Sequence, residues 1–427
     1  MGISNSRGIS FGILAAGALL ALPLATRADI FRWDNGKPIP GSAGIILAPG
    51  VNLSDWNTGK KNLLKAGFAA ADLSNANFSD SNLSKSRFGL RSQGGNTPVD
   101  LAGANFTGAN IAGADFRLAQ HVTAAQIAST QTFNKNKLSG LMLDDADLTS
   151  IDLNHKNLRS TDFEFCTLTS ATFSGANISR ANFTGAEGFT AGQLASTRNF
   201  THHNISGINF TDVDISGINL TKVNLSKTLL TDADLSGATF TKANLTKTNL
   251  NDADLRGATG ITLKKNTLTH DTIQSDGSIN GLALGNGETL TIRNNATAVT
   301  AKTTATFGAG STIAFSLQDN WTSPMDFANG INPTLGGTID LDVAPGVDPS
   351  TLAGHTFQIF NWNSAPTGGN QFASIVTDPS IVWDTTNLYV NGTVTAVSFV
   401  GNPAPEPASL GIMAAASLLL LRRRRRA

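Results

Sequence analysis

Three aspartates recur at intervals of twenty residues and are the clearest candidates for chemistry in this 427-residue sequence: Asp212, Asp232 and Asp252. If the chain coils with that period, their carboxylates stack in one outward column. Carboxylates one strand spacing apart repel by roughly 1 kcal/mol in water, and Ca²⁺ is a hard cation that prefers several oxygen ligands. The column therefore predicts a Ca²⁺ site, with a solvated acidic face as the alternative interpretation.

Other reactive side chains form no recognisable constellation. His202 and His203 are adjacent, but no third metal ligand follows at a typical spacing. Cys166 is the only cysteine, so no disulfide can form within the chain. Beyond the predicted signal peptide, whose residues 8–12 fit G-x-S-x-G by chance of composition, the sequence has no G-x-S-x-G motif, phosphate-binding glycine loop or C-x-x-C pair. We therefore predict no catalytic or cofactor-binding residue, although a carboxylate pair drawn from distant coils would leave no such motif.

The element that must position the aspartates is a five-residue repeat between residues 66 and 258. A central Leu, Phe or Ile, called position i, returns every fifth residue, as in Leu73, Phe78 and Leu83. Neither the helical period of 3.6 nor the strand period of 2 fits this spacing. Position i−2 is small or apolar, so two side chains in five face inward. Position i−1 is mostly Asp or Asn and i+1 mostly Ser or Thr, residue types that stabilise tight turns.

These units resemble the pentapeptide-repeat family, whose pattern is matched by Ala71-Asp72-Leu73, Ala104-Asn105-Phe106, Ala181-Asn182-Phe183 and Ala233-Asp234-Leu235. The resemblance implies an all-β fold, a right-handed quadrilateral β-helix with four units per coil. Residues 211–230 align without a gap onto residues 231–250, which independently indicates a true period of twenty. Cys166 falls at an inward position and is predicted to be a small core residue. Lys156 and His203 also fall at nominally inward positions, which indicates local distortion, because an unpaired buried charge is costly.

The repeat is interrupted at three places. Residues 89–99 form a Gly-rich segment, which predicts a loop. Residues 119–130 and 186–197 resemble each other, and Thr123 with Gln126 and Thr190 with Gln193 have capping-box spacing. Each of these two insertions is predicted to open a short helix. A weaker copy begins at Ala258.

Both ends of the chain carry targeting patterns. Residues 1–28 have an apolar run and a small-residue site typical of a secretory signal peptide, with a buried first helix as the alternative. Near the other end, Pro405-Glu406-Pro407 precedes fourteen uncharged residues and the basic tail Arg422, Arg423, Arg424, Arg425 and Arg426. Fourteen helical residues span about 21 Å, less than the roughly 30 Å hydrocarbon core. Residues 403–427 resemble the PEP-CTERM sorting signal, and an ordinary tail anchor is the alternative.

That resemblance implies recognition by an exosortase-type enzyme, transient inner-membrane anchoring, and delivery to the outer surface of a Gram-negative bacterium alongside exopolysaccharide. The whole chain has 31 basic and 31 acidic residues. Loss of residues 1–28 and of the tail from Glu406 leaves a net charge of −6. This charge gives no support for nucleic-acid binding.

Two further regions complete the predicted organisation. Residues 29–65 are predicted to cap the first coil, because a solenoid needs a terminal cover; a separate binding function is the alternative. Residues 266–400 lose the five-residue period and show alternating runs such as 288–292, 338–343 and 393–397. Asn-Gly pairs punctuate this region, which predicts hairpins and an antiparallel β domain with the architecture of a sandwich.

The function that these patterns favour is that of an exported, non-enzymatic protein of the cell surface or extracellular matrix, in which the β-helix is a spacer or interaction scaffold. One alternative is an enzyme that acts on extracellular polysaccharide. Another is a DNA-mimic inhibitor, which the predicted export and two lysine columns, 222 with 242 and 227 with 247, argue against. Fold alone does not decide between these functions.

Overall fold

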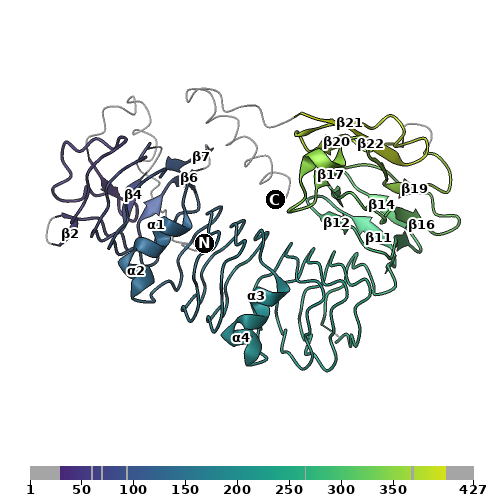
Figure 1. Ribbon diagram of the computed structural model, residues 1–427, viewed down its shortest axis with the longest axis horizontal. Coiled ribbons are helices and arrows are strands. Elements are labelled where there is room, and N and C mark those ends of the chain that lie inside the picture. Colours follow the sequence, from purple (N-terminus) through teal and green to yellow (C-terminus); the bar gives the residue numbers. More distant parts are fainter. Residues whose placement is uncertain are drawn as a thin grey trace, which may run out of the picture.

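The computed structural model describes residues 29–58, 61–68, 71–92, 95–264, 266–366 and 370–400. The predicted signal peptide (1–28) and sorting signal (403–427) lie outside the described residues. Within the described ranges the chain forms two successive β-helices, which Figure 1 shows as an arc with the N-terminal coils at the left and the second β-helix at the right.

The first β-helix has four five-residue units in each regular coil. Residues twenty apart pair in parallel through single bridges, as in Asp147 with Thr167 and Asp214 with Asp234. Coils that contain an insertion are longer, since Asn182 pairs with Asn209. The predicted square coil and its period of twenty are confirmed.

The inward positions fill the interior without a gap along the helix axis. The central residues and the small residues two positions before them are buried, and they form one continuous apolar core from Ile30 to Ala258. Phenylalanines from successive coils stack: the ring centroids of Phe68 and Phe88 are 4.9 Å apart, and those of Phe88 and Phe116 are 4.6 Å apart. Cys166 is fully buried in this core, as predicted.

Each corner is a four-residue turn. The amide at i+3 donates to the carbonyl oxygen of the central residue, as from Ala76 to Leu73 at 3.0 Å. Position i+2 has a positive φ, with Asp232 at 55° and Gly237 at 67°, which explains the Asp and Gly residues found there. The residue at i−1 accepts a hydrogen bond from the amide at i+1, as Asp72 does from Ser74 at 3.0 Å. The turn role predicted for Asp and Asn is confirmed.

The N-terminal segment covers the first coil, but the coil begins earlier than predicted. Asn52 already pairs in parallel with Asn77, before the predicted boundary at residue 66. Ile30 and Ile39 are buried at the end of the core, consistent with a cap. The short strands here are β1 (Phe31–Arg32), β2 (Asn57–Thr58), β3 (Lys61–Asn62), β4 (Ala66–Phe68) and β5 (Arg87–Phe88); β1 pairs antiparallel with β4.

The three interruptions have different structures. Residues 89–99, predicted as a loop, contain an antiparallel pair of β6 (Leu90–Ser92) with β7 (Gly95–Thr97). Strands β8 (Val99–Asp100) and β9 (Ala119–Gln120) then continue the parallel stacking. The two homologous insertions each hold two short helices, α1 (Ala124–Ser129) with α2 (Gln131–Asn134), and α3 (Ala191–Ser196) with α4 (Arg198–Thr201). The weaker copy after Ala258 contains no helix in its described residues.

The predicted capping boxes are present at both helical insertions. Thr123 and Thr190 accept from the amides of Gln126 and Gln193, whose side chains accept from the threonine amides in return. The Gln193 side chain also donates to the carbonyl oxygens of Leu168 and Ala171, at 2.9 and 2.8 Å. Each box therefore fastens its helix to the coil beneath it.

Residues 266–400 are all-β as predicted, but most of their strands pair in parallel, so the predicted antiparallel sandwich is wrong for this part. Strand β12 pairs in register with β15, which pairs with β17 and then β20. A second face carries β10, β13, β16 and β19, and a third carries β11 and β14. The region is thus a second β-helix with three faces. Its strands are β10 (Ser278–Ile279), β11 (Leu282–Leu284), β12 (Thr289–Arg293), β13 (Val299–Ala301), β14 (Ala305–Phe307), β15 (Thr312–Leu317), β16 (Met325–Phe327), β17 (Thr338–Val343), β19 (Phe360–Asn361) and β20 (Ser374–Thr377).

The Asn-Gly pairs explain the error. Asn286-Gly287 joins β11 to β12, which lie on different faces, so the pair makes a corner and not a hairpin. Gly287, at φ 81°, supplies the same left-handed residue that a hairpin would need. Among the described strands of this region, antiparallel pairing is confined to one sheet, in the order β18 (Thr356–Gln358), β22 (Thr393–Phe399), β21 (Ile381–Asp384), beside the short 3₁₀ helix η2 (Pro349–Leu352).

Candidate cation site at the junction of the two β-helices

The aspartate column predicted from the sequence exists, but it faces strand β12 of the second β-helix. Thr291 donates from its amide and its hydroxyl to the two carboxylate oxygens of Asp232, at 3.2 and 2.9 Å. Arg293 donates to Asp212 at 3.2 Å and to the carbonyl oxygen of Asp232 at 3.0 Å. The column is therefore an interface between the two β-helices, and Asp212 and Asp232 already have cationic or hydroxyl partners.

Arg293 is largely buried at this interface, with 16% of its side chain exposed. Burial alone would lower the pKa of its guanidinium, but the carboxylates of Asp232, Asp234 and Asp212 outweigh burial and raise that pKa. Arg293 is thus held as a cation between two coils of the column.

The column has a fourth member that the twenty-residue period did not predict. The last coil of the first β-helix is one residue shorter, because Asn249 pairs with Leu268 and Asp254 with Ile273. This shift places Asp271 above Asp252, and Asp271 has the same left-handed backbone, with φ 48°. Its carboxylate accepts from the amide of Ala283 in β11, at 3.1 and 3.3 Å.

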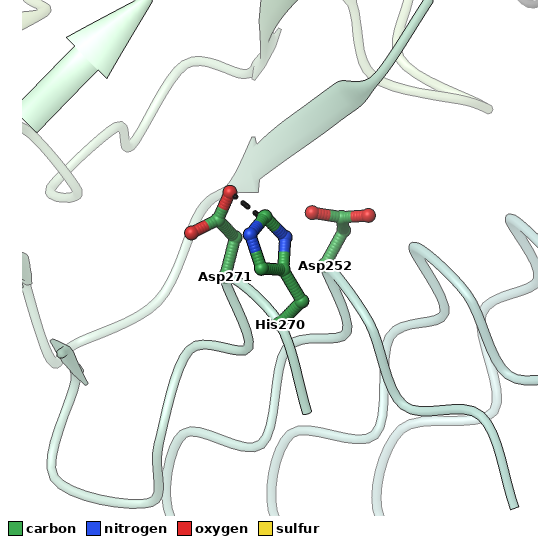
Figure 2. Close-up of side chains that lie close together, drawn as sticks. All are labelled: Asp252, His270 and Asp271. Atoms are coloured by element: carbon green, nitrogen blue, oxygen red, sulfur yellow. Dashed lines mark ion pairs between the residues drawn. The ribbon is translucent and has the colours of Figure 1, made fainter. Parts of the chain in front are cut away.

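Three ligand-type side chains converge at this end of the column. Figure 2 shows the carboxylates of Asp252 and Asp271 on either side of the His270 imidazole. One ligand atom from each residue lies within 4.8 Å of the other two. The Nδ1 atom of His270 is 3.3 Å from Oδ2 of Asp271. Asp252 is only 6% exposed, and its Oδ1 has no hydrogen-bond partner among the described residues.

The electrostatics of the three residues reflect this crowding. Burial, followed by the negative charges of Asp232, Asp271 and Glu288, raises the pKa of Asp252 to about 8. Burial also raises the pKa of Asp271, against the lowering effects of the Ala283 amide and of His270. A buried carboxylate without a cationic partner favours its neutral form, or recruits a cation.

A second buried ionic contact joins the β-helices beside the column. Arg256 is 1% exposed and donates from Nε and Nη2 to Asp254, at 3.0 and 2.5 Å. Its other donors reach the second β-helix, at the carbonyl oxygens of Thr297 (2.8 Å) and Arg293 (2.7 Å) and the hydroxyl of Ser323 (3.2 Å). Asp254, interpreted from the sequence as a turn residue, therefore also anchors an arginine that crosses the junction.

The other residues singled out from the sequence lie elsewhere. His202 follows the C-terminal end of α4, and its Nδ1 is 2.8 Å from the carbonyl oxygen of Arg198 at the start of that helix. It borders a hollow of about 320 Å³ with Asn177 and Asn204. His203 is exposed, at a left-handed position. Lys156 is half-buried, and its Nζ contacts Phe133 of α2, 4.1 Å from the ring centroid. The predicted local distortion is confirmed at His203, whereas the coil at Lys156 keeps its regular corner, since the Lys156 amide donates to the carbonyl oxygen of Leu153 at 3.1 Å.

A second acidic group, formed by Asp144, Asp162 and Glu164, also brings three carboxylates within 4.8 Å. Asn182 donates to Asp162 at 2.9 Å and to Glu164 at 3.4 Å. The charges of Asp162 and Asp144 contribute to raising the pKa of the neighbouring Arg117. This group is therefore compensated within the first β-helix. The residues of the predicted sorting motif, Pro405, Glu406, Pro407 and Arg422–Arg426, lie outside the described residues.

Sequence reasoning missed His270, Asp271, Arg293 and Arg256 as parts of one site. The twenty-residue alignment ended before the shortened coil, so Asp271 fell out of register with the column. The one available signal was the spacing of Asp252 and Asp271, which a nineteen-residue coil brings into line. Arg293 lies in a region whose strand pairing was predicted incorrectly.

Comparison with known proteins supports the architecture. The family model described as pentapeptide repeats matches in eight copies, over residues 50–89, 99–120, 143–185 and 218–257. The chain therefore contains pentapeptide repeats, beginning near residue 50 as the structure also indicates. None of the curated proteins compared with the chain matches it.

Three solved structures are similar to parts of the chain. HetL, a pentapeptide repeat protein involved in heterocyst differentiation regulation in the cyanobacterium Nostoc sp. strain PCC 7120, is 24% identical over 54% of this chain and 92% of its own, with a TM-score of 0.17. A pentapeptide repeat protein from the thylakoid lumen of Arabidopsis thaliana is 23% identical over 33% of this chain and 65% of its own, with a TM-score of 0.14. QnrB1, a plasmid-mediated fluoroquinolone resistance protein, is 15% identical over 53% of this chain and 88% of its own, with a TM-score of 0.18. TM-scores this low carry no functional argument.

Proposed function

We propose that this chain, which carries pentapeptide repeats, is an exported, non-enzymatic protein of a bacterial cell surface or extracellular matrix, and that its β-helices act as a rigid spacer or interaction scaffold. The observation that carries the scaffold role is the buried junction between the two β-helices. Arg256 bonds to both of them while almost fully buried, so the second β-helix is fastened to the first. A stiff body of stacked coils suits a spacer.

The distribution of charged groups supports a structural role over a catalytic one. The buried ions at the junction form pairs, Arg256 with Asp254 and Arg293 with Asp232. The described hollow beside α4 is shallow and open, unlike the concave pockets that enzymes use for substrates. The proposal therefore assigns no catalytic residue.

Export is supported by the sequence patterns at the two ends. Residues 1–28 read as a signal peptide, and residues 403–427 resemble a PEP-CTERM tail. Among the described residues, no helix is long and apolar enough to cross a membrane. The proposed partners are an exosortase-type enzyme, which removes the tail, and exopolysaccharide at the outer surface of a Gram-negative cell.

The decisive experiment measures the intact mass of the native protein in cytoplasmic, inner-membrane and outer-surface fractions. The proposal expects a surface species that lacks both residues 1–28 and the arginine tail. Replacing Pro405, Glu406 and Pro407 with alanine in one variant should leave an uncleaved species in the inner membrane. In the control, replacing the exposed Lys222 with alanine should leave sorting unaffected. A full-length cytoplasmic species would overturn the proposed export.

The non-enzymatic role is tested on the same purified surface species. Incubation with exopolysaccharide from the producing cells should cause co-sedimentation without any change in the chain length of the polysaccharide. Progressive shortening of the polysaccharide would contradict this part of the proposal and favour the enzyme alternative.

A further inference from the structure

We propose that Asp252, His270 and Asp271 bind one divalent transition-metal cation of the Zn²⁺ type at the junction of the two β-helices. The site goes beyond the scaffold function proposed above and does not depend on export. It lies at the end of the aspartate column, where the last two coils of the first β-helix meet strand β11.

The need for a cation follows from the contrast between Asp252 and its neighbours. Asp232 receives two hydrogen bonds from Thr291, and Asp254 pairs with Arg256. Asp252 is buried to the same degree as Asp232, yet in the part of the chain that the structure describes its Oδ1 has no hydrogen-bond partner. An unpartnered buried carboxylate is costly, and a bound cation would satisfy it.

The donor set selects the class of metal. One imidazole and two carboxylates suit Zn²⁺ and similar transition metals, whereas Ca²⁺ takes six to eight oxygen ligands. Ligand atoms about 2.1 Å from a tetrahedral metal lie roughly 3.4 Å from one another. The 3.3 Å separation of His270 Nδ1 and Asp271 Oδ2 matches one such edge. The ligand atom of Asp252 lies within 4.8 Å of those of His270 and Asp271, so the three must move closer together to reach the spacing that a metal requires.

The side chains can make that movement without disturbing the core. The His270 side chain is 50% exposed, so its ring can turn toward Asp252 (Figure 2). Asp271 is held by the amide of Ala283, which orients its carboxylate as outer partners commonly do in metal sites. The backbone also fixes the two coils, because the amide of Asp252 donates to the carbonyl oxygen of His270 at 2.9 Å.

The proposed site replaces the three-aspartate arrangement that the sequence suggested. Asp212 and Asp232 are occupied by Arg293 and Thr291, which leaves Asp252 as the member of the column free to ligate. A cation held by Asp252 and Asp271 would link two successive coils, and through Ala283 it would also stabilise the start of the second β-helix.

The test uses the mature chain freed of metal with a chelator and then titrated with Zn²⁺ alone, by calorimetry and thermal unfolding. The wild type should bind one Zn²⁺ and melt at a higher temperature. Asp252→Asn should melt higher than wild type in chelator, because it removes an ionisable group whose charged form burial disfavours, and should lose the Zn²⁺-dependent rise. His270→Gln should weaken Zn²⁺ binding by about tenfold or more.

The matched control is His121→Asn, because His121 is an exposed histidine paired with a single carboxylate, 2.7 Å from Asp100. This variant should bind Zn²⁺ like the wild type. An Asp252→Asn protein that folds normally and retains the full Zn²⁺ response would overturn the proposal. So would stabilisation by Ca²⁺ that exceeds that by Zn²⁺ and persists in His270→Gln, because the ligands would then be oxygens alone.

Discussion

Arg256, at the end of the pentapeptide repeats, donates from Nη1 to the carbonyl oxygen of Thr297 at 2.8 Å, although the two residues belong to different β-helices. The same guanidinium pairs with Asp254 in its own coil. One side chain therefore ties the regular square coils to the three-faced helix that follows. The stability of the junction depends on a buried ion pair, which gives the first prediction.

Replacing Arg256 with Leu should destabilise the chain by about 3–5 kcal/mol, because Asp254 would be left buried without its cation. Combining Arg256→Leu with Asp254→Asn should recover part of that loss, since Asn retains the turn hydrogen bond without the charge. Chemical denaturation of the two single variants and the double variant measures the coupling. Equal destabilisation in the Arg256→Leu single variant and in the double variant would contradict this account.

The register of the square coil is tested at Leu235, a fully buried central residue. Leu235→Asp should destabilise the first β-helix by several kcal/mol, because it places a charge in the apolar interior. Leu229 provides the matched control, since it is 42% exposed and occupies an i−1 position where Asp is common. Leu229→Asp should be neutral or stabilising in thermal unfolding, and similar effects at the two sites would refute the register.

Stability at acid pH should depend on Asp115. Burial alone would raise the pKa of Asp115, but hydrogen bonds from Arg117, at 2.9 and 2.6 Å, outweigh burial and hold that pKa below its usual value. A lowered folded-state pKa stabilises the fold above the unfolded-state pKa of about 3.9, and this contribution is lost as the pH falls further.

Arg117→Gln should therefore cost about 1 kcal/mol at pH 7 and much less at pH 2. Urea denaturation at the two pH values measures the difference. Arg159, an exposed arginine on another coil, offers a control whose replacement by Gln should show no such pH dependence. A penalty for Arg117→Gln that is equal at both pH values would rule out the ion pair as its cause.

The helical insertions should depend on their capping boxes. Thr190→Ala should cost about 1 kcal/mol, because the amide of Gln193 loses its acceptor at the start of α3. Thr190→Asp retains an acceptor and should preserve stability. Hydrogen exchange of the α3 amides measures the local effect, and identical exchange in the Ala and Asp variants would show that the cap is not required.

The parts of the fold that followed from the sequence are those built from local contacts. Each corner of the first β-helix needs a left-handed residue at i+2 and an Asp or Asn at i−1, and both requirements are visible in five residues. The capping boxes of Thr123 and Thr190 are likewise complete within four residues. These predictions held because the interacting groups are close neighbours in the chain.

The second β-helix shows where local patterns stop being informative. Alternation predicted strands at 288–292, 338–343 and 393–397, and β12, β17 and β22 lie there. Alternation does not specify the partner of a strand or its direction. Thr338 pairs with Thr312 and Ser374 in parallel, across separations of many residues. An Asn-Gly pair supplies a residue with positive φ to a β-helix corner as readily as to a hairpin. The turn residues therefore do not distinguish antiparallel pairing from parallel stacking.

The period of twenty and the column of aspartates follow from the sequence, because the same residue types recur at the same positions of successive units, and the resemblance to pentapeptide repeats implied the square coil. What the column contacts depends on how the two β-helices pack against each other. The shortened coil brought Asp271 beside Asp252, and the docking of β12 gave Arg293 to Asp212 and Asp232. Such contacts join residues 59 or 81 positions apart, and the packing of two finished β-helices, rather than any local pattern, selects them.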